Sequence, residues 1–151
     1  EPLFLILENL QDPGNLGTMI RTGEGAGITG VIMNQQTVDI FNPKTIRATM
    51  GSIFRVPFVY VPELSTVLTQ MHERGIHTYA AHLKGQKYYD SFSFREPTAF
   101  LIGNEGNGLT KEISDQAGQY LKIPMEGKVE SLNASIAAAL LMYEAHRQRN
   151  L

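Results

Sequence analysis

Residues 123–135 read IPMEGKVESLNAS, and they decide how the end of the chain folds. An apolar strand-like run ends at Met125, a turn follows, and an alanine-rich helical segment begins near Ser131. Polar Ser131 and Asn133 therefore lie where a strand gives way to a helix, a place where packing alone does not require them. In open α/β sheets, ligands usually bind where strand ends lead into helix starts. The stretch therefore predicts a ligand site near the C-terminus.

The rest of the chain alternates between strand-like and helix-like segments. Residues 3–7 (LFLIL) form a continuous apolar run, as expected of a strand buried on both faces. Pro57, in the run 56–61, indicates an edge strand or the first residues of a strand. The expected strands are residues 3–7, 31–33, 56–61, 76–80, 98–102 and 120–123, and the expected helices begin near residues 13, 43, 64, 111 and 131. This alternation predicts an α/β fold with a mainly parallel sheet and helices on both faces, whereas residues 84–96 are expected to form a surface loop.

The composition restricts the possible classes of protein. At 151 residues the chain has the size of one domain. It contains no cysteine, which excludes disulfides, thiolate nucleophiles and zinc–thiolate sites and is consistent with a reducing, cytoplasmic compartment. No apolar stretch is long enough to span a bilayer, and no signal peptide opens the chain.

The charge balance limits how the chain can contact nucleic acid. A net charge of −2 is not the basic footprint of a protein that holds nucleic acid across its whole surface. Any such contact must rest on local patches or on a domain outside this sequence. The chain starts at Glu1 and enters a strand directly, so we expect it to be one domain of a longer protein.

A second candidate segment, residues 9–23 (NLQDPGNLGTMIRTG), joins the first expected strand to the first helix. Asn15 and Arg21 lie less than two helical turns apart, and we expect both to face one cleft near the helix start. The alternative is ordinary helix capping with Arg21 as a solvated surface residue. Glycines at positions 23, 25 and 27 argue against it, because each costs a helix up to ~1 kcal/mol relative to alanine.

A third segment, residues 101–109 (LIGNEGNGL), places three glycines directly after a buried strand. Glycines allow unusual backbone conformations and bring amides close to a ligand. The segment lacks the Gly-Lys-Ser/Thr of a nucleoside-triphosphate loop, and its glycine order is wrong for a dinucleotide-binding oxidoreductase. A simple tight turn is the alternative here, as a helix cap at Ser131 is for residues 123–135.

Other polar residues give weaker indications. The histidines at 72, 77 and 82 recur every five residues and share no helical face, which argues against a metal site. Lys44, Arg47 and Arg55 follow the second expected strand and either contact phosphates or form a solvated helix face.

In this order and spacing, the three segments resemble the motifs of the SpoU/TrmH family of RNA ribose 2′-O-methyltransferases, within the SPOUT superfamily. The matching pieces are NLQDPGNLGTMIRTGEGAG, LIGNEGNGL and IPMEGKVESLNASIAAAL, and the resemblance runs from Leu3 to about Arg149. It implies a C-terminal deep trefoil knot, an S-adenosylmethionine site made by the knot loops and a homodimer. It also implies that residues 1–151 are the catalytic domain, and many members carry a preceding RNA-binding domain. Ribosomal RNA is the expected substrate by analogy; transfer RNA, or a non-catalytic RNA-binding module that keeps the fold, are the alternatives.

The resemblance also assigns roles to individual residues. Asn15 and Arg21 match residues that face the target ribose, Glu105 matches the second-motif acid, and Ser131 and Asn133 match the third-motif polar pair. The positions expected to bind the cofactor are Ala80, Ala81, His82, Leu101, Ile102, Gly103, Asn104, Gly106, Ile123, Met125, Ser131, Leu132 and Asn133. Those expected to contact RNA are Arg21, Lys44, Arg47 and Arg55.

The expected chemistry needs no metal and no protein nucleophile, because the cofactor brings the electrophile. Arginine keeps its proton throughout the physiological pH range, so Arg21 is expected to act electrostatically, although a role as general base stays open. The last helix is apolar over most of its surface, as expected of a helix that packs on a partner subunit.

Overall fold

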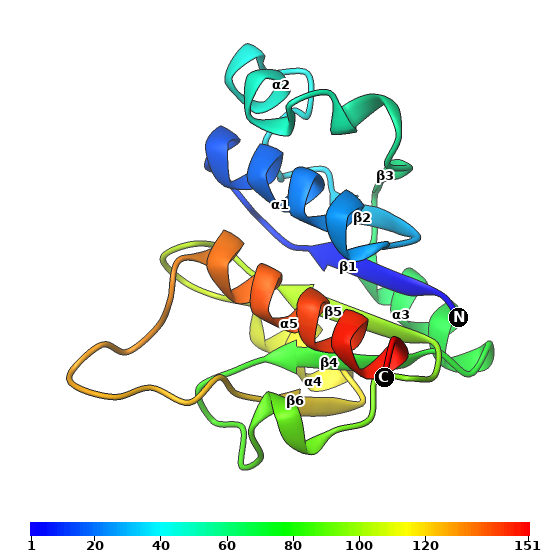
Figure 1. The fold of residues 1–151 in the computed structure, drawn as a ribbon, viewed down its shortest axis with the longest axis vertical. Coiled ribbons are helices and arrows are strands. Elements are labelled where there is room, and N and C mark those ends of the chain that lie inside the picture. Colours follow the sequence, from blue (N-terminus) through cyan, green and yellow to red (C-terminus); the bar gives the residue numbers. More distant parts are fainter.

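The structure, a computed structural model, describes residues 1–151 as one six-stranded parallel sheet with helices on both faces (Figure 1). The strands are β1 (Leu3–Leu7), β2 (Gly30–Asn34), β3 (Phe58–Val61), β4 (His77–Ala81), β5 (Thr98–Ile102) and β6 (Gln119–Leu121). The helices are α1 (Pro13–Ala26), α2 (Pro43–Thr49), α3 (Leu64–Glu73), α4 (Lys111–Gln116) and α5 (Ala134–Arg149), with short 3-10 helices η1 (Ser52–Phe54) and η2 (Tyr89–Ser91). The expected α/β class is confirmed. None of these helices is both long and apolar enough to cross a membrane.

The order of the strands places a switch point at the centre of the sheet. The order is β3-β2-β1-β5-β4-β6, so β3 is an edge strand, as Pro57 indicated. The chain runs outward from β1 through β2 to β3, and the remaining strands β4, β5 and β6 lie on the other side of β1. The carboxyl ends of β1 and β5 therefore lie side by side where the direction of winding changes, the usual place for a ligand in such a sheet.

Two apolar cores cover the two faces of the sheet. The larger core packs α1 and α5 on one face, with Leu16, Met19 and Leu141 fully buried. The smaller core packs α3 and α4 on the other face, through Leu68 and Ile113. Figure 1 shows α1 and α5 side by side across the sheet, with α2 on the outer side of α1.

Local sequence signals explain where α1 and α2 begin. Asp12 accepts a hydrogen bond from the amide of Asn15 at 2.9 Å and Pro13 occupies the first turn. Asn42 and Pro43 start α2 in the same way. Gly27 ends α1 in the left-handed conformation, with φ of 79°.

Three expectations need correction. Helix α5 begins at Ala134 rather than Ser131, because Asn133 is the residue whose side chain caps the helix. The last strand ends at Leu121, two residues earlier than expected. Residues 84–96 are not simply a surface loop, because Phe94 is completely buried and packs edge-on against Phe100, with ring centroids 4.9 Å apart.

Arg149 ties the two ends of the chain together. Its guanidinium donates hydrogen bonds to the carbonyl oxygens of Glu1, Pro2, Phe94 and Glu96 at 2.7–3.1 Å. Burial lowers the pKa of Arg149 from its ordinary value, and the four carbonyls compensate for the lost water. The N-terminus of β1 and the C-terminus of α5 consequently lie close together (Figure 1).

Arg149→Ala is expected to lower the free energy of unfolding by about 2–3 kcal/mol, because it leaves several carbonyls without their charged donor. Urea denaturation followed by circular dichroism measures this change. Arg74→Ala is the control, since Arg74 is exposed and its side chain makes no hydrogen bond; its effect is expected within about 0.5 kcal/mol. Equal stabilities of the two variants would contradict a stabilising role for the four Arg149 hydrogen bonds.

Candidate functional site

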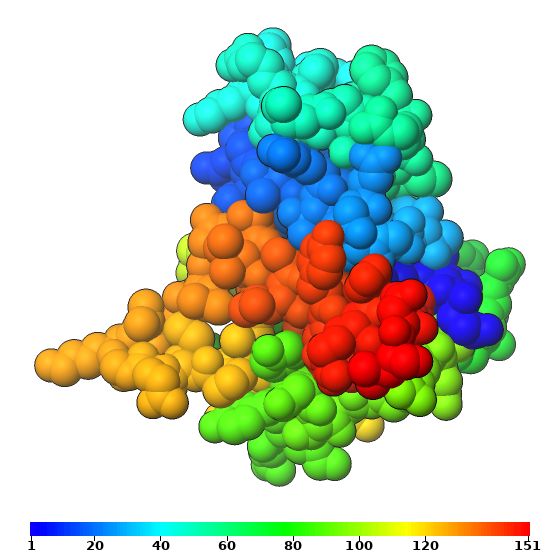
Figure 2. Space-filling view, viewed as in Figure 1, coloured from blue at the N-terminus to red at the C-terminus, as the bar shows by residue number.

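A cavity of about 490 Å³ opens at the carboxyl ends of β4, β5 and β6. It is lined by residues 81–83, 88, 102–109, 122, 123, 125, 129–132, 134 and 137. Residues 122–132 of this set belong to the long connection between β6 and α5, which projects from the body as an arm in Figure 2, and residues 134 and 137 belong to α5. Two of the three motif segments, residues 101–109 and 123–135, therefore form most of one cavity.

The glycine-rich loop that follows β5 folds back on itself. The backbones of Asn104 and Gly108 exchange two hydrogen bonds of 3.1 and 2.8 Å, and the Asn104 side chain accepts from the amides of Gly106 and Asn107. A Cβ atom at Gly103 would lie 2.1 Å from the nitrogen of Leu109. Only glycine fits at position 103, because the loop turns tightly against its own backbone there.

Glu105 joins this loop to the first motif segment. Its carboxylate accepts hydrogen bonds from the backbone amide of Gln11, at 3.0 and 3.1 Å, and from that of Asp12, at 2.7 Å. The Asn104 side chain donates to the carbonyl of Asn9 at 2.8 Å. The geometry therefore gives Glu105 a role in holding the start of α1, and its carboxylate makes no hydrogen bond to Arg21.

Asn15 and Asn133 meet although 118 residues separate them. The Nδ2 of Asn133 donates to Oδ1 of Asn15 at 3.1 Å. The Oδ1 of Asn133 accepts from the amides of Ser135 and Ile136 and thereby caps α5. This contact brings the first and third motif segments together beside the cavity.

Arg21 does not lie with Asn15 as expected. Six helical positions place the two side chains about 120° apart around the axis of α1. Arg21 is exposed, does not line the cavity and makes no hydrogen bond or ion pair. It lies one helical turn before Gly25, which faces the Tyr143 hydroxyl of α5.

Most of the expected cofactor residues line the cavity, and three do not. Ala80 and Leu101 point to the opposite face of the sheet, because successive side chains of a strand alternate; Leu101 packs in the smaller core. Asn133 lies outside the lining because it faces Asn15 and caps α5. The expected positions that do line the cavity are Ala81, His82, Ile102, Gly103, Asn104, Gly106, Ile123, Met125, Ser131 and Leu132.

Residues 2–143 match the profile of the SpoU rRNA Methylase family. The chain belongs to the SpoU methylase family. Among its curated relatives, the 23S rRNA (guanosine(2553)-2′-O)-methyltransferase RlmP of Bacillus subtilis is 37% identical over 139 residues, which are 92% of this chain and 56% of RlmP. YacO of the same organism, assigned to the TrmH family of tRNA/rRNA methyltransferases, is 37% identical over 150 residues. This SpoU chain spans 56–60% of the length of these relatives.

Solved structures of SpoU methyltransferases share the fold. The crystal structure of AviRb from Streptomyces viridochromogenes with the cofactor AdoMet superposes with a TM-score of 0.92 at 34% identity, covering 99% of this chain and 58% of AviRb. An AdoMet-bound rRNA methyltransferase from Sinorhizobium meliloti gives a TM-score of 0.89 at 36% identity, covering 97% of this chain and 56% of that one.

The cavity of this SpoU chain also contains residues that sequence reasoning missed. Tyr88 and Lys122 line it together, with the Lys122 ammonium 5.3 Å from the centre of the Tyr88 ring. Lys122 directly precedes the third motif segment, so its place in the sequence could have indicated that it lies near the cavity. Tyr88 belongs to the irregular segment 84–96, and the sequence does not predict that this segment reaches the cavity.

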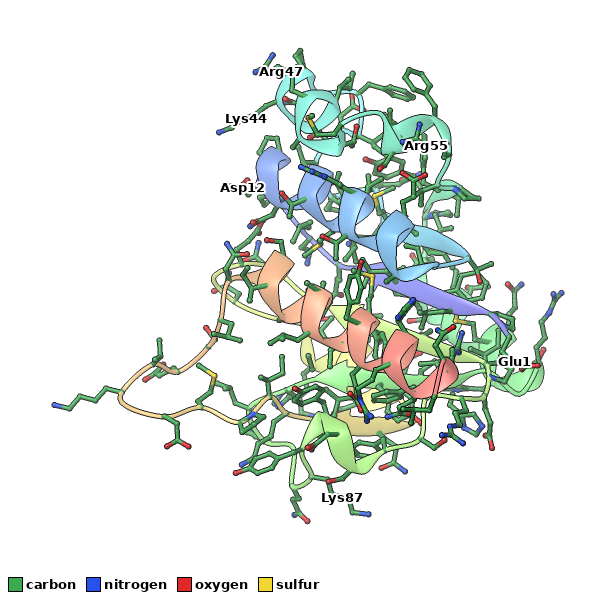
Figure 3. The ribbon with its side chains drawn as sticks, viewed as in Figure 1. Glu1, Asp12, Lys44, Arg47, Arg55 and Lys87 are labelled. Atoms are coloured by element: carbon green, nitrogen blue, oxygen red, sulfur yellow. The ribbon has the colours of Figure 1, made fainter.

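The four cations expected to contact RNA differ in their surroundings. Arg55 forms an ion pair with Glu24, and its hydrogen bond lowers the pKa of that carboxyl. Lys44 and Arg47 are exposed on α2 and have no side-chain partner. Figure 3 shows them extending from α2 into solvent, at the opposite end of the molecule from Lys87. Arg21, Lys44 and Arg47 are therefore free to bind phosphate, whereas Arg55 already has a partner.

Proposed function

We propose that this chain is the catalytic domain of an enzyme that transfers a methyl group from S-adenosylmethionine to a ribose 2′-hydroxyl of RNA. The observation that carries the proposal is the Asn15–Asn133 contact, which places the first motif segment beside a cavity built by the other two. The named activity of RlmP and the AdoMet complexes of AviRb and the Sinorhizobium enzyme support it. Ribosomal RNA is the favoured substrate because RlmP acts on 23S rRNA.

The cavity fits the cofactor. Its volume of about 490 Å³ falls within the range of small-molecule sites, roughly 300–1,000 Å³. Ile102, Ile123 and Leu132 give it apolar walls, and the tight turn at Gly103, which also lines it, leaves no room for a side chain. Bound there, S-adenosylmethionine supplies an electrophilic methyl group, so the chain itself needs no nucleophile.

The residues of the chain then have to align the ribose and stabilise its developing negative charge. Alignment of two bound reactants is worth roughly 7–11 kcal/mol. We assign the alignment to Asn15 and Asn133, which lie beside the cavity, and to Ser131, which lines it. Arg21 binds the adjacent phosphate and lowers the pKa of the ribose hydroxyl, and phosphate or water takes the proton, since arginine keeps its own.

A homodimer is part of the proposal. Ile136, Leu140 and Tyr143 form an exposed apolar stripe on α5, and 51%, 37% and 45% of their respective surfaces remain accessible. Tyr143 also reaches Gly25 of α1, so this stripe continues into the surface that carries Arg21. A second copy packed on α5 would bury the stripe and lie next to Arg21.

Two further expectations belong to the proposal. The path of residues 122–133 from the sheet edge to α5 is expected to complete the deep trefoil knot of the SPOUT fold. The enzyme is expected to work in the cytoplasm, and the longer protein is expected to carry an RNA-binding domain before residue 1.

Methyl transfer tests the proposed function directly. The full-length protein should transfer label from S-[methyl-³H]adenosylmethionine to ribosomal RNA purified from cells that lack the gene. Nuclease digestion and mass spectrometry should then find a 2′-O-methylated nucleoside. Labelling of transfer RNA alone would show that the substrate is transfer RNA rather than ribosomal RNA. RNA binding without any methyl transfer would favour the non-catalytic module.

A further inference from the structure

Glu8 is a buried carboxylate that none of the motif segments includes. It follows β1 directly and is 5% exposed. One of its oxygens accepts the backbone amide of Thr110 at 2.7 Å, and the other accepts the Thr110 hydroxyl at 2.8 Å. Glu8 forms no ion pair and does not line the cavity. Its only side-chain partner is therefore Thr110, 102 residues away.

Thr110 lies where the cavity ends and α4 begins. It directly follows the cavity-lining residues 102–109. Its hydroxyl accepts the amide of Ile113 at 3.3 Å and so caps α4. Burial of a carboxylate is costly unless charge-assisted hydrogen bonds compensate for it. Glu8 therefore holds the far end of the glycine-rich loop with bonds stronger than neutral ones.

Three connections join this loop to the segment between β1 and α1. Glu105 binds the amides of Gln11 and Asp12, Asn104 binds the carbonyl of Asn9, and Glu8 binds Thr110. Glu105 and Asn104 act near the middle and the start of the loop, and Glu8 acts at its end. One carboxylate comes from each segment, so the loop is fixed near its start and at its end.

We propose that Glu8 is a positioning residue for the cofactor cavity. It acts through Thr110 and keeps residues 103–109 in the conformation that receives the ligand. The inference rests on the proposed function for the identity of the ligand, but not for the effect on the loop. A binding site that is ordered before the ligand arrives avoids the ordering cost on binding. Loss of Glu8 should therefore weaken cofactor affinity in a protein that is still folded.

Calorimetry with S-adenosylmethionine at 10 °C tests this on the wild type, Glu8→Ala, Glu8→Gln, Thr110→Val and Thr110→Ser. We expect Kd to rise about tenfold in Glu8→Ala, which corresponds to the loss of a buried charged hydrogen-bond partner. Glu8→Gln loses the negative charge of the acceptor and Thr110→Val loses the hydroxyl bond, so each should show a smaller rise. Thr110→Ser keeps both donors and should bind like the wild type.

Asn42→Ala is the matched control for general destabilisation. The Oδ1 of Asn42 accepts the amide of Lys44 at 2.9 Å and caps α2. The substitution removes this cap, which is far in sequence from the glycine-rich loop. Its stability should fall as in Thr110→Val, with Kd unchanged. If wild type binds and Glu8→Ala binds equally well, the inference is overturned while the proposed function stands.

Amide hydrogen exchange of the protein without cofactor gives a readout independent of the ligand. The amides of Asn104, Gly106, Asn107 and Gly108 are hydrogen-bonded within the loop. They should exchange faster in Glu8→Ala and in the milder Glu8→Gln than in wild type or Asn42→Ala. Unchanged exchange at these amides contradicts the inference, whether or not the wild type binds S-adenosylmethionine. Absence of binding by the wild type would contradict the proposed function instead.

Discussion

Arg21→Ala is expected to lower the rate of methyl transfer by about 100- to 1,000-fold, the usual effect of removing a group that stabilises developing charge. Cofactor affinity should hardly change, because Arg21 is exposed and does not line the cavity. Single-turnover assays with RNA measure the rate, and calorimetry with S-adenosylmethionine measures the affinity. Arg21→Lys should recover part of the rate, since it keeps the charge and loses the planar fork that matches a phosphate.

Lys87→Ala is the control for a general loss of positive charge. Lys87 is exposed and lies far from α2 and the start of α1 (Figure 3). Its removal should leave the rate unchanged. A parallel loss of rate and cofactor affinity in Arg21→Ala would assign Arg21 to the cofactor site and contradict its proposed role.

Gly103→Ala is expected to raise the Kd for S-adenosylmethionine about 100-fold, as a displacement of about 1 Å in a positioned site can. The added Cβ would lie 2.1 Å from the nitrogen of Leu109 and 2.2 Å from the carbonyl carbon of Gly108. Both contacts are with backbone, so the loop itself has to move. Overpacking of this kind also lowers stability, typically by about 1–3 kcal/mol.

Gly106→Ala is the matched comparison within the same loop. Its added Cβ would meet only Oδ1 of Asn104, at 3.6 Å, which is an ordinary contact. The rise in Kd should therefore be much smaller than for Gly103→Ala. If the two variants bind equally well, the tight turn at Gly103 does not shape the cofactor site.

The sequence predicted the elements of the fold well where the signals were local. The apolar runs at residues 3–7 and 98–102 gave the central strands, and Pro13 and Pro43 marked helix starts. The predicted start of α5 at Ser131 was wrong because Ser131 and Asn133 are both good capping residues. Only the fold decides between them: Asn133 caps the helix and Ser131 lines the cavity.

Contacts between distant segments could not be predicted from local patterns. The order of the strands and the Asn15–Asn133 contact depend on how the whole chain packs. The resemblance put Leu101 among the cofactor residues, whereas its side chain packs in the smaller core, on the face of the sheet away from the cavity. Glu8 gave no signal in the sequence, since a lone carboxylate after a strand is commonly a surface residue.

A crystal structure of the protein with S-adenosylmethionine is the most direct test of the account. The central claim is that residues 102–109 and the connection from β6 to α5 form the cofactor site, next to Asn15 and Asn133. We predict that the ligand fills this cavity with its methyl group directed toward that asparagine pair. Ligand density elsewhere on the protein, or a methyl group directed away from the pair, would contradict the account.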